Sequence, residues 1–211
     1  MSKVYIIAGP PGIGKSTSGK YFVPPFVEIL NHDSLLLHYK YKARADYEDW
    51  ANLKANEFIL RQLELKNNFG VELNLGFDSH YELLRFITRE HSSYQIEVVL
   101  FYTDDMKVCL RRASLREEAG GHHVDANIIL KMYENTVPLI KNNTHLIHGI
   151  QLVNVDFESI ELVYSKEKDS IFSVLERPNW VNSLAPETLN LEKSKNWKPI
   201  ADSQKPNKLC P

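Results

Sequence analysis

The chain has 211 residues, of which 43% are hydrophobic and 25% charged, as is typical of one globular domain with a full core. Its formal net charge of -2 gives no overall positive field, so nucleic acid is not an expected partner. Two cysteines cannot build a disulfide framework, which fits a reducing, cytoplasmic location. The apolar runs are far shorter than the roughly 20 residues of a membrane span, so no membrane partner is expected.

Strand-like apolar runs alternate with helical patterns along the whole first part of the chain. This alternation predicts an α/β fold with a parallel sheet of about five strands and helices on both faces. The strands are expected at 4–8, 26–30, 70–75, 96–102 and 150–155. Helices are expected at 15–22, at 46–66, after Asp78 or Ser79, from Thr103, Asp104 or Asp105 to Gly120-Gly121, and from Asp125 until Pro138 kinks or breaks the last one.

A glycine-rich segment directly follows the first apolar run and matches the phosphate-loop pattern G-x-x-x-x-G-K-[ST]. A loop that leaves a buried strand and opens a helix presents successive backbone N–H groups to a polyphosphate. Lys15 would contact the β- and γ-phosphates, and the Ser16 hydroxyl would complete the coordination of Mg²⁺. The predicted nucleotide-binding residues are Gly9, Pro10, Pro11, Gly12, Ile13, Gly14, Lys15, Ser16 and Thr17.

Asp33 follows the second predicted strand, at the edge of the sheet where ligands bind in open parallel sheets. A carboxylate at this position can accept the proton of an incoming hydroxyl during phosphoryl transfer. Two alternatives stay open from the residues alone. Asp33 could cap a helix that starts at Ser34, and it could hold Mg²⁺ through water.

Glu72 and Asn74 lie in the third predicted strand and point to the face opposite Val71, Leu73 and Leu75. Charged groups inside a parallel strand are rarely left without a partner. A pair that faces a cleft could bind the hydroxyl groups of an acceptor. The alternative is a structural carboxylate that pairs with an arginine in the core.

Arg112 and Arg116 lie four residues apart in a predicted helix, so they share one face and repel each other unless an anion lies between them. A γ-phosphate in transfer is such an anion, and arginine stabilises its transition state. Gly120 and Gly121 follow, and could act as the hinge of a closing lid. The alternative is a solvated basic helix face.

Together these segments resemble the zeta-toxin-like family of P-loop small-molecule kinases over about residues 1–155. The resemblance rests on GPPGIGKST, on Asn31-His32-Asp33, on the strand-borne Glu72, and on arginines four apart before Gly-Gly-His-x-Val. It implies ATP- or GTP-dependent phosphorylation of a sugar hydroxyl, with a uridine diphosphate amino sugar as the family's known acceptor. Carried over, it makes Lys15 and Ser16 the nucleotide and Mg²⁺ residues, Asp33 the base, Glu72 the acceptor contact, and Arg112 and Arg116 the lid. It also implies an antitoxin-type protein partner.

The pattern of strands and helices weakens beyond about residue 165, which predicts a P-loop kinase domain, residues 1–165, and a C-terminal extension, residues 166–211. The last 20 residues or so are rich in Lys, Asn, Ser and Pro, which predicts loose order. Two other functions remain open. One is a nucleotide or polynucleotide 5′-kinase on the same scaffold, and the other is a regulatory module that binds nucleotide with little turnover.

Overall fold

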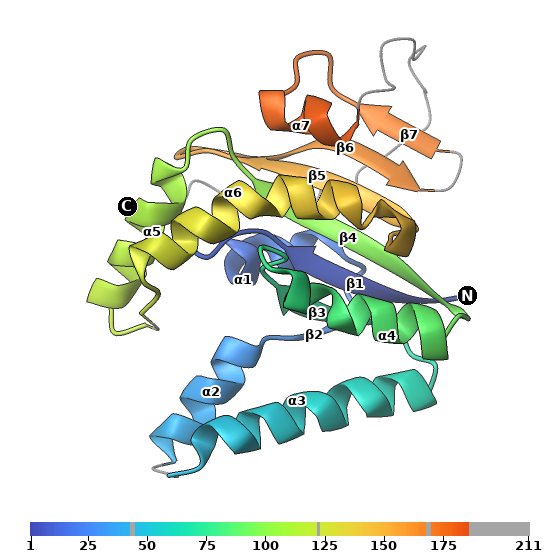
Figure 1. The fold of residues 1–211 in the computed structure, drawn as a ribbon, viewed down its shortest axis with the longest axis vertical. Helices are drawn as coiled ribbons and strands as arrows, with labels where there is room; N and C mark the ends of the chain where they lie inside the picture. Colours follow the sequence, from blue (N-terminus) through green and yellow to red (C-terminus); the bar gives the residue numbers. More distant parts are fainter. Residues whose placement is uncertain (43–44, 122, 168–169, 186–211) are drawn as a thin grey trace.

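A computed structural model describes residues 1–42, 45–121, 123–167 and 170–185, which form one sheet with helices on both faces (Figure 1). The strand order is β2-β3-β1-β4-β5-β6-β7. Strands β1 to β5 run parallel, and β6 and β7 continue the sheet antiparallel. The strands are β1 (Ser2–Ala8), β2 (Glu28–Leu30), β3 (Phe69–Leu73), β4 (Tyr94–Tyr102), β5 (Gly149–Val155), β6 (Ile160–Glu167) and β7 (Ser170–Ser173).

The helices connect these strands, mostly as crossovers between parallel neighbours. They are α1 (Lys15–Ser18), α2 (His32–Tyr41), α3 (Tyr47–Glu64), α4 (Glu82–Glu90), α5 (Lys107–Glu118), α6 (Ala126–Asn142) and α7 (Asn179–Leu184), with short 3₁₀ helices η1 (Gly19–Phe22), η2 (Asp78–Tyr81) and η3 (Thr144–Leu146). Among the residues that the structure describes, no helix is long and apolar enough to cross a bilayer.

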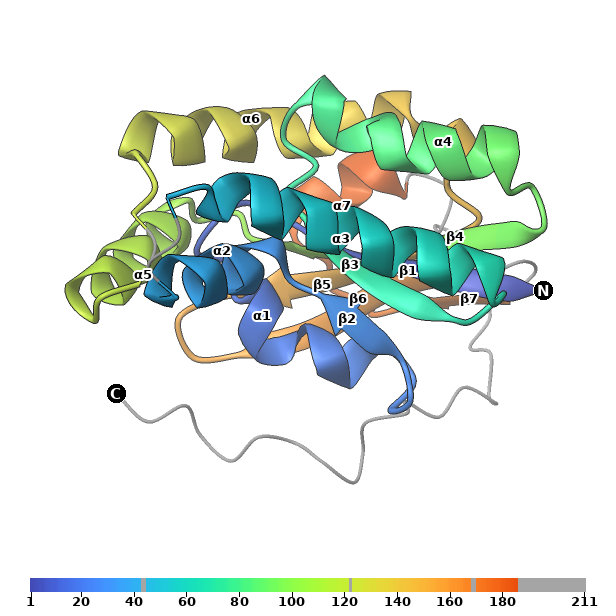
Figure 2. The ribbon, with the colours of Figure 1, turned by 90° about the horizontal axis from the view of Figure 1, so that it is seen from below.

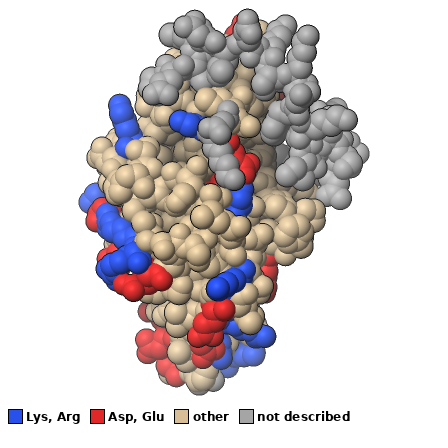
Figure 3. Space-filling model, turned by 90° about the vertical axis from the view of Figure 1, so that its right-hand side faces the viewer, with Lys and Arg blue, Asp and Glu red and all other residues tan. Residues whose placement is uncertain are grey.

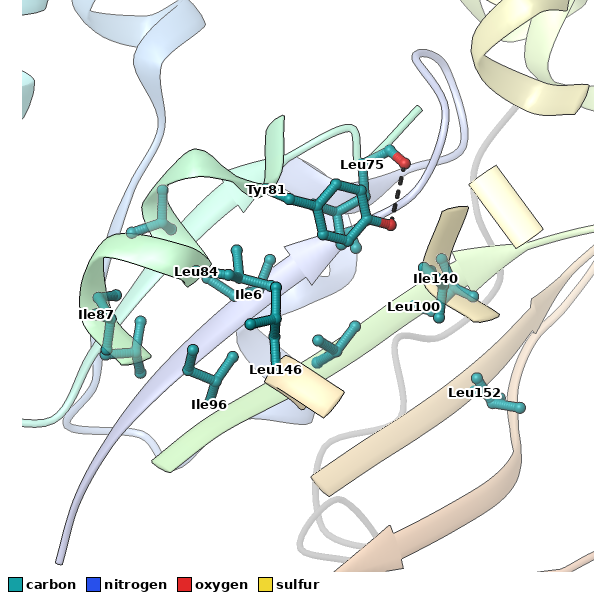
Figure 4. Packing of buried hydrophobic residues seen from close by; sticks show 14 of the residues in the cluster. Ile6, Leu75, Tyr81, Leu84, Ile87, Ile96, Leu100, Ile140, Leu146 and Leu152 are labelled. Carbon is teal, nitrogen blue, oxygen red and sulfur yellow. Dashed lines mark hydrogen bonds between the residues drawn. The ribbon is translucent and has the colours of Figure 1, made fainter. Parts of the chain in front are cut away.

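The alternation of side chains along the strands builds a separate core on each face of the sheet. On one face, Ile6 of β1 and Leu100 of β4 pack with Leu84 of α4 and Ile140 of α6. Figure 4 shows this cluster, in which the buried Tyr81 hydroxyl donates a hydrogen bond to the Leu75 carbonyl at 3.4 Å. On the other face, the odd-numbered residues of β1 pack with residues of the phosphate loop and of α5. Figure 2 shows α4 and α6 on one side of the sheet and α1 on the other.

The five predicted strands are confirmed, with small shifts at their ends. Strand β2 begins at Glu28 rather than at Phe26, because a turn in which the N–H of Val27 donates to the Pro24 carbonyl precedes it. Strand β3 ends at Leu73 rather than at Leu75, because Leu75 has a φ of 52° and no strand continues through a left-handed residue. Strands β6 and β7 were not predicted.

The predicted helices form, but several details differ. The helix expected at 15–22 is α1 followed by η1. Helix α4 begins after η2, with Tyr81 and not Asp78 or Ser79 at its cap position, because the Asp78 carboxylate accepts from Arg85 instead. Helix α5 begins at Lys107, with Met106 at the cap position predicted for Thr103, Asp104 or Asp105.

The helix that Asp125 caps was expected to kink or break at Pro138, and α6 instead continues to Asn142. Proline removes the hydrogen bond to the carbonyl of Glu134. Both residues are exposed, so water can satisfy that carbonyl.

The C-terminal part of the described chain packs on the same sheet. The boundary predicted at residue 165 falls inside β6, and residues 190–211, predicted to be loosely ordered, lie outside the described residues. Helix α7 docks at the end of β4, where the carboxylate of Asp104 accepts from the N–H groups of Asn179 and Trp180 at 3.0 and 3.3 Å. The Trp180 side chain is buried against Tyr102.

Asp104→Ala is expected to lower the free energy of unfolding by about 1 kcal/mol, because two N–H groups at the start of α7 lose their acceptor. Urea denaturation followed by circular dichroism measures the change. Glu64→Ala, which removes an exposed carboxylate from the last turn of α3, is the control and should stay within about 0.5 kcal/mol of wild type. Equal stability of the Asp104 variant and wild type would contradict the assigned cap.

Candidate functional site

The phosphate loop connects β1 to α1 at the carboxyl edge of the sheet. Gly9, Gly12 and Gly14 have φ values of 136°, 81° and 105°, which residues with side chains rarely adopt. The space is also restricted, because a Cβ on Gly9 would lie 2.2 Å from the Phe101 carbonyl oxygen and one on Gly12 would lie 2.3 Å from that of Cys109. The loop therefore needs glycine at these positions. Of the other predicted loop residues, Pro11 and Ile13 are buried and Thr17 is exposed on α1.

The Lys15 ammonium group lies inside the loop. Its Nζ donates to the carbonyl oxygens of Gly9 and Pro10 at 2.7 and 3.1 Å, and to Oδ1 of Asn74 at 2.8 Å. Burial lowers the pKa of Lys15 to about 8, although the negative charges of Glu72 and Asp33 oppose that shift. All three acceptors are neutral. A bound polyphosphate would therefore give this ammonium group a negatively charged partner in direct contact.

The Ser16 hydroxyl lies between two polar side chains. It donates to Oε2 of Glu72 at 2.6 Å and accepts from Nδ2 of Asn31 at 2.9 Å. Hydroxyl and carboxylate oxygens are the ligands that Mg²⁺ prefers, and Mg²⁺ in nucleotide sites usually needs only one or two carboxylates beside the phosphates. These donor atoms therefore fit the Mg²⁺ site predicted at Ser16.

Asp33 lies in the first turn of α2, and Asn31 caps this helix. Oδ1 of Asn31 accepts from the N–H of Ser34 at 2.9 Å, so the helix begins earlier than Ser34 and Asp33 is not its cap. The Asp33 carboxylate is exposed and close enough to Lys15 to raise the pKa of that lysine. Within residues 1–42, 45–121, 123–167 and 170–185, its side chain forms no hydrogen bond or ion pair. It therefore remains available to a ligand.

Glu72 and Asn74 extend toward the phosphate loop, on the face of β3 opposite the apolar residues, as predicted. Val71 and Leu75 are buried in the cluster that Figure 4 shows, while Glu72 contacts Ser16 and Asn74 contacts Lys15. The sheet register places Glu72 beside Ile7 of β1. Within the described part of the chain neither side chain pairs with an arginine, so the structure there does not show the structural alternative for Glu72.

Arg112 lies against the phosphate loop. Its guanidinium group donates to the Ile13 carbonyl at 3.2 Å and to the Asp156 carbonyl at 2.8 Å, which joins the loop to the turn between β5 and β6. Burial lowers the pKa of Arg112, and this guanidinium remains charged. Since a guanidinium group has five N–H donors, contacts with two carbonyls leave donors for a phosphate.

Arg116 lies one turn further along α5, and its positive charge is close enough to lower the pKa of Lys15. The helix ends directly after it. The N–H of Gly120 donates to the Glu117 carbonyl at 2.8 Å and that of Gly121 to the Arg116 carbonyl at 2.9 Å, with Gly120 at a φ of 82°. This is a Schellman motif. The double glycine thus ends the helix, and its predicted action as a lid hinge stays a prediction.

Two residues of the site, Asn31 and His80, were given no role from the sequence. Asn31 contacts Ser16 and caps α2, a position at which asparagine and aspartate are equally common, so the sequence did not distinguish Asn31 from Asp33. His80 follows β3, and Nδ1 of its ring accepts from the N–H of Phe77 at 3.3 Å. Burial and the charge of Lys15 lower the pKa of His80. A single histidine in the short helical segment η2 gave no pattern that could have placed it here.

Two hollows lie away from this site, at the amino ends of the strands. One of about 680 Å³ is lined by residues that include Met1, Phe26 and Asn68, and one of about 410 Å³ lies beside α3. Their linings combine acids, amides and one or two cations, without a loop of converging N–H groups. The phosphate loop, not these hollows, is where the chemistry-bearing residues meet.

Comparisons with known proteins give matches among solved structures. No family model and no curated protein matches the sequence. A chain of the AvrRxo1-ORF1:AvrRxo1-ORF2 complex with sulphate ions matches with a TM-score of 0.61 and 10% identity, over 82% of this chain and 61% of that one. The present chain therefore spans about 61% of the length of that relative. The same complex has also been solved with ATP.

Two further structures are similar. One belongs to the PezAT chromosomal toxin-antitoxin system of Streptococcus pneumoniae, with a TM-score of 0.55 and 16% identity over 81% of this chain and 74% of that one. The other is from the Pnkp1/Rnl/Hen1 RNA repair complex, with a TM-score of 0.53 and 18% identity over 67% and 46%. At these identities the likeness concerns the fold. The chain has the α/β fold of the zeta-toxin-like P-loop kinases, as its sequence predicted.

Proposed function

We propose that the protein is a kinase that transfers the γ-phosphoryl group of ATP or GTP to a hydroxyl group of a small molecule. The observation that carries this proposal is the proximity of Asp33 to Lys15. The two are close enough for the Asp33 charge to raise the pKa of Lys15, and Asn31 caps α2 in place of Asp33. Among the described residues this carboxylate has no hydrogen-bond or ion-pair partner, and its nearness to Lys15 supports the proposal that it meets the attacking hydroxyl of an acceptor.

In the proposed reaction, the loop N–H groups and Lys15 bind the β- and γ-phosphates. Asp33 accepts the proton of the acceptor hydroxyl while the oxygen of that hydroxyl bonds to the γ-phosphorus. The bond between the γ-phosphorus and the oxygen that bridges to the β-phosphate breaks, and the nucleoside diphosphate leaves with that oxygen. Arg112 and Arg116 stabilise the charge on the transferring group. Mg²⁺, when bound with the nucleotide, would be held at Ser16 and would neutralise charge on the phosphate oxygens.

The acceptor and the protein partner come from the resemblance of the sequence. It favours a uridine diphosphate amino sugar as acceptor and an antitoxin-type partner, and the similarity of the fold to part of a toxin-antitoxin system supports the partner. The test is incubation of the protein with Mg-ATP and a fractionated small-molecule extract. We expect ADP formation that depends on one fraction, and hydrolysis by water alone in every fraction would reject the proposal.

A polynucleotide 5′-kinase is the second candidate, and the similarity to a chain of an RNA repair complex favours it. The charges weigh against it. The formal net charge is -2, which gives no overall positive field, and the face in Figure 3, at the amino ends of the strands and away from the phosphate loop, carries Lys and Arg interspersed with Asp and Glu. A polynucleotide kinase should phosphorylate a 5′-hydroxyl oligonucleotide, with an affinity that falls steeply as salt rises. For a regulatory module, Asp33→Ala should leave the biological output unchanged.

Nucleotide affinity is expected to fall as the pH rises above about 8. Burial lowers the pKa of Lys15 to about 8 in the free protein, and bound phosphates raise it again because they favour the ammonium form. Below pH 8 both states hold the proton and Lys15 adds no pH dependence. Between about 8 and about 10.4, binding takes up a proton and weakens by up to about tenfold per pH unit.

Isothermal titration calorimetry at pH 9, in two buffers of different ionisation enthalpy, measures this proton uptake. Lys20→Met, which removes an exposed lysine from η1, is the control and should keep the dependence. Lys15→Arg should lose it, because guanidinium stays charged over this range. An affinity that is constant from pH 7 to pH 10 would contradict the position of the Lys15 ammonium group among neutral acceptors.

A further inference from the structure

The contacts of Glu72 differ from those of a residue that waits for an acceptor. Its Oε2 accepts the proton of the Ser16 hydroxyl at 2.6 Å, while Nδ2 of Asn31 donates to the same hydroxyl oxygen at 2.9 Å. A serine hydroxyl has one proton and two lone pairs. With the proton given to Glu72 and one lone pair used by Asn31, one lone pair remains for a cation.

The position of Glu72 is set by the sheet and not by a loop. In β3 it pairs in register with Ile7 of β1, two residues before the phosphate loop begins. Gly70 precedes it on the same face, and a Cβ there would lie 3.0 and 3.3 Å from Ile29 and Ile7 side-chain atoms. The strand thus packs tightly against its neighbours on this face, and its backbone places the Glu72 carboxylate within hydrogen-bond distance of Ser16.

The charge of Glu72 is not neutralised by direct contact. Among the described residues no cation forms an ion pair with it, and Lys15 donates instead to Gly9, Pro10 and Asn74. Asn31, which contacts the same Ser16 hydroxyl, is neutral and also brings no positive charge. A half-buried carboxylate whose hydrogen-bond donor is a neutral hydroxyl is costly unless a cation arrives. The divalent ion of a nucleotide complex is such a cation, and in P-loop proteins it is held by the loop hydroxyl together with a carboxylate.

We propose that Glu72 serves the metal ion rather than the acceptor: it holds the Ser16 hydroxyl and offers its negative charge to the metal and its waters, with Asn31 fixing the hydroxyl from the other side. This inference rests on the proposed binding of Mg-nucleotide and deepens it. It makes Glu72 a positioning residue that acts through Ser16. It also leaves Asp33 and Asn74 as the predicted polar contacts for the acceptor.

The test is the affinity for ATP with Mg²⁺ and with excess EDTA, measured without any acceptor. In wild type Mg²⁺ should increase the affinity. In Glu72→Gln that gain should shrink by about 10- to 100-fold, the usual cost of removing a residue that supports a metal ligand, while the metal-free affinity is unchanged or higher. Gln is isosteric and still accepts from Ser16, and a thermal melt verifies that the variant folds.

Two further variants complete the design. Glu82→Gln, which changes an exposed carboxylate in the first turn of α4, is the matched control and should keep the full gain. Glu72→Asp should recover part of the gain because it restores the charge. An unchanged Mg²⁺ gain in Glu72→Gln would overturn the inference, as would a wild type whose affinity does not respond to Mg²⁺.

Failure of the kinase proposal looks different. A gain from Mg²⁺ that depends on Glu72, without phosphoryl transfer to any hydroxyl, would support the metal assignment and reject the kinase. Transfer that continues with a normal Mg²⁺ gain but a raised KM for the acceptor in Glu72→Gln would support the kinase. That result would return Glu72 to the acceptor and overturn the inference.

Discussion

Asp33→Asn is expected to lower the rate of phosphoryl transfer by about 10²- to 10⁴-fold, the usual contribution of a positioned general base. The amide keeps the shape of the side chain but cannot accept the proton of the attacking hydroxyl. Asp33 makes no described contact that holds the fold and Asn31 caps α2, so the variant should fold and bind Mg-ATP with an affinity within about threefold of wild type. A coupled assay for ADP gives the rate, and calorimetry gives the affinity.

Asp49→Asn provides the control for this experiment. Asp49 is another exposed carboxylate in the first turn of a helix, α3, so it matches Asp33 in exposure and helix position. Its substitution should leave both transfer and binding unchanged. If Asp33→Asn transfers phosphate as fast as wild type, the hydroxyl proton goes elsewhere and Asp33 is not the base. If both rate and nucleotide affinity collapse, Asp33 acts on the nucleotide instead.

Gly12→Ala is expected to destabilise the protein by about 2–5 kcal/mol and to reduce kcat/KM by about 100-fold or more. The new Cβ would lie 2.3 Å from the carbonyl oxygen of Cys109 and 3.2 Å from the N–H nitrogen of Ala113, both in the backbone of α5. Loop and helix must then separate. Arg112 and Arg116 lie on that helix, so the separation moves the loop N–H groups and both guanidinium groups apart together.

Gly120→Ala isolates the steric part of this effect. Gly120 has a φ of 82°, against 81° for Gly12, but a Cβ there would meet no atom within 4 Å. Its substitution should cost only the left-handed backbone strain, about 1–2 kcal/mol, and reduce kcat/KM much less than Gly12→Ala does. Denaturant unfolding and steady-state kinetics on both variants make the comparison. Equal losses of activity in the two would show that the contact between loop and α5 does not position the site.

The sequence predicted the features that depend on short-range patterns. The run from Val4 to Ser16 combines a buried strand with glycines at fixed intervals, and the structure places a phosphate loop there. The alternation in β3 correctly predicted that Glu72 and Asn74 oppose the apolar residues. These predictions depended only on period-two alternation and on glycine positions, which a single segment carries.

Features that depend on distant partners were not predictable in the same way. Asn31 caps α2 through Oδ1 and is also held by the Ser16 hydroxyl, to which its Nδ2 donates, and Ser16 lies on another element. Strand β6 pairs antiparallel with β5 across a register shift near Leu152, and it ends in exposed Lys166 and Glu167, so its pattern resembles a loop. The rule that proline kinks or breaks a helix assumes that the carbonyl left without a hydrogen bond is buried. Here that carbonyl belongs to Glu134, which is exposed, so water can bind it.

The measurement that tests the central claim most directly follows the γ-phosphoryl group itself. Wild type and Asp33→Asn are incubated with Mg-ATP labelled at the γ-phosphate and with the acceptor fraction, and the products are separated by mass. We expect wild type to place the label in a phosphate ester of a small molecule and the variant to yield almost none. Label that appears only in inorganic phosphate, or equal amounts of labelled ester from both proteins, would contradict the account.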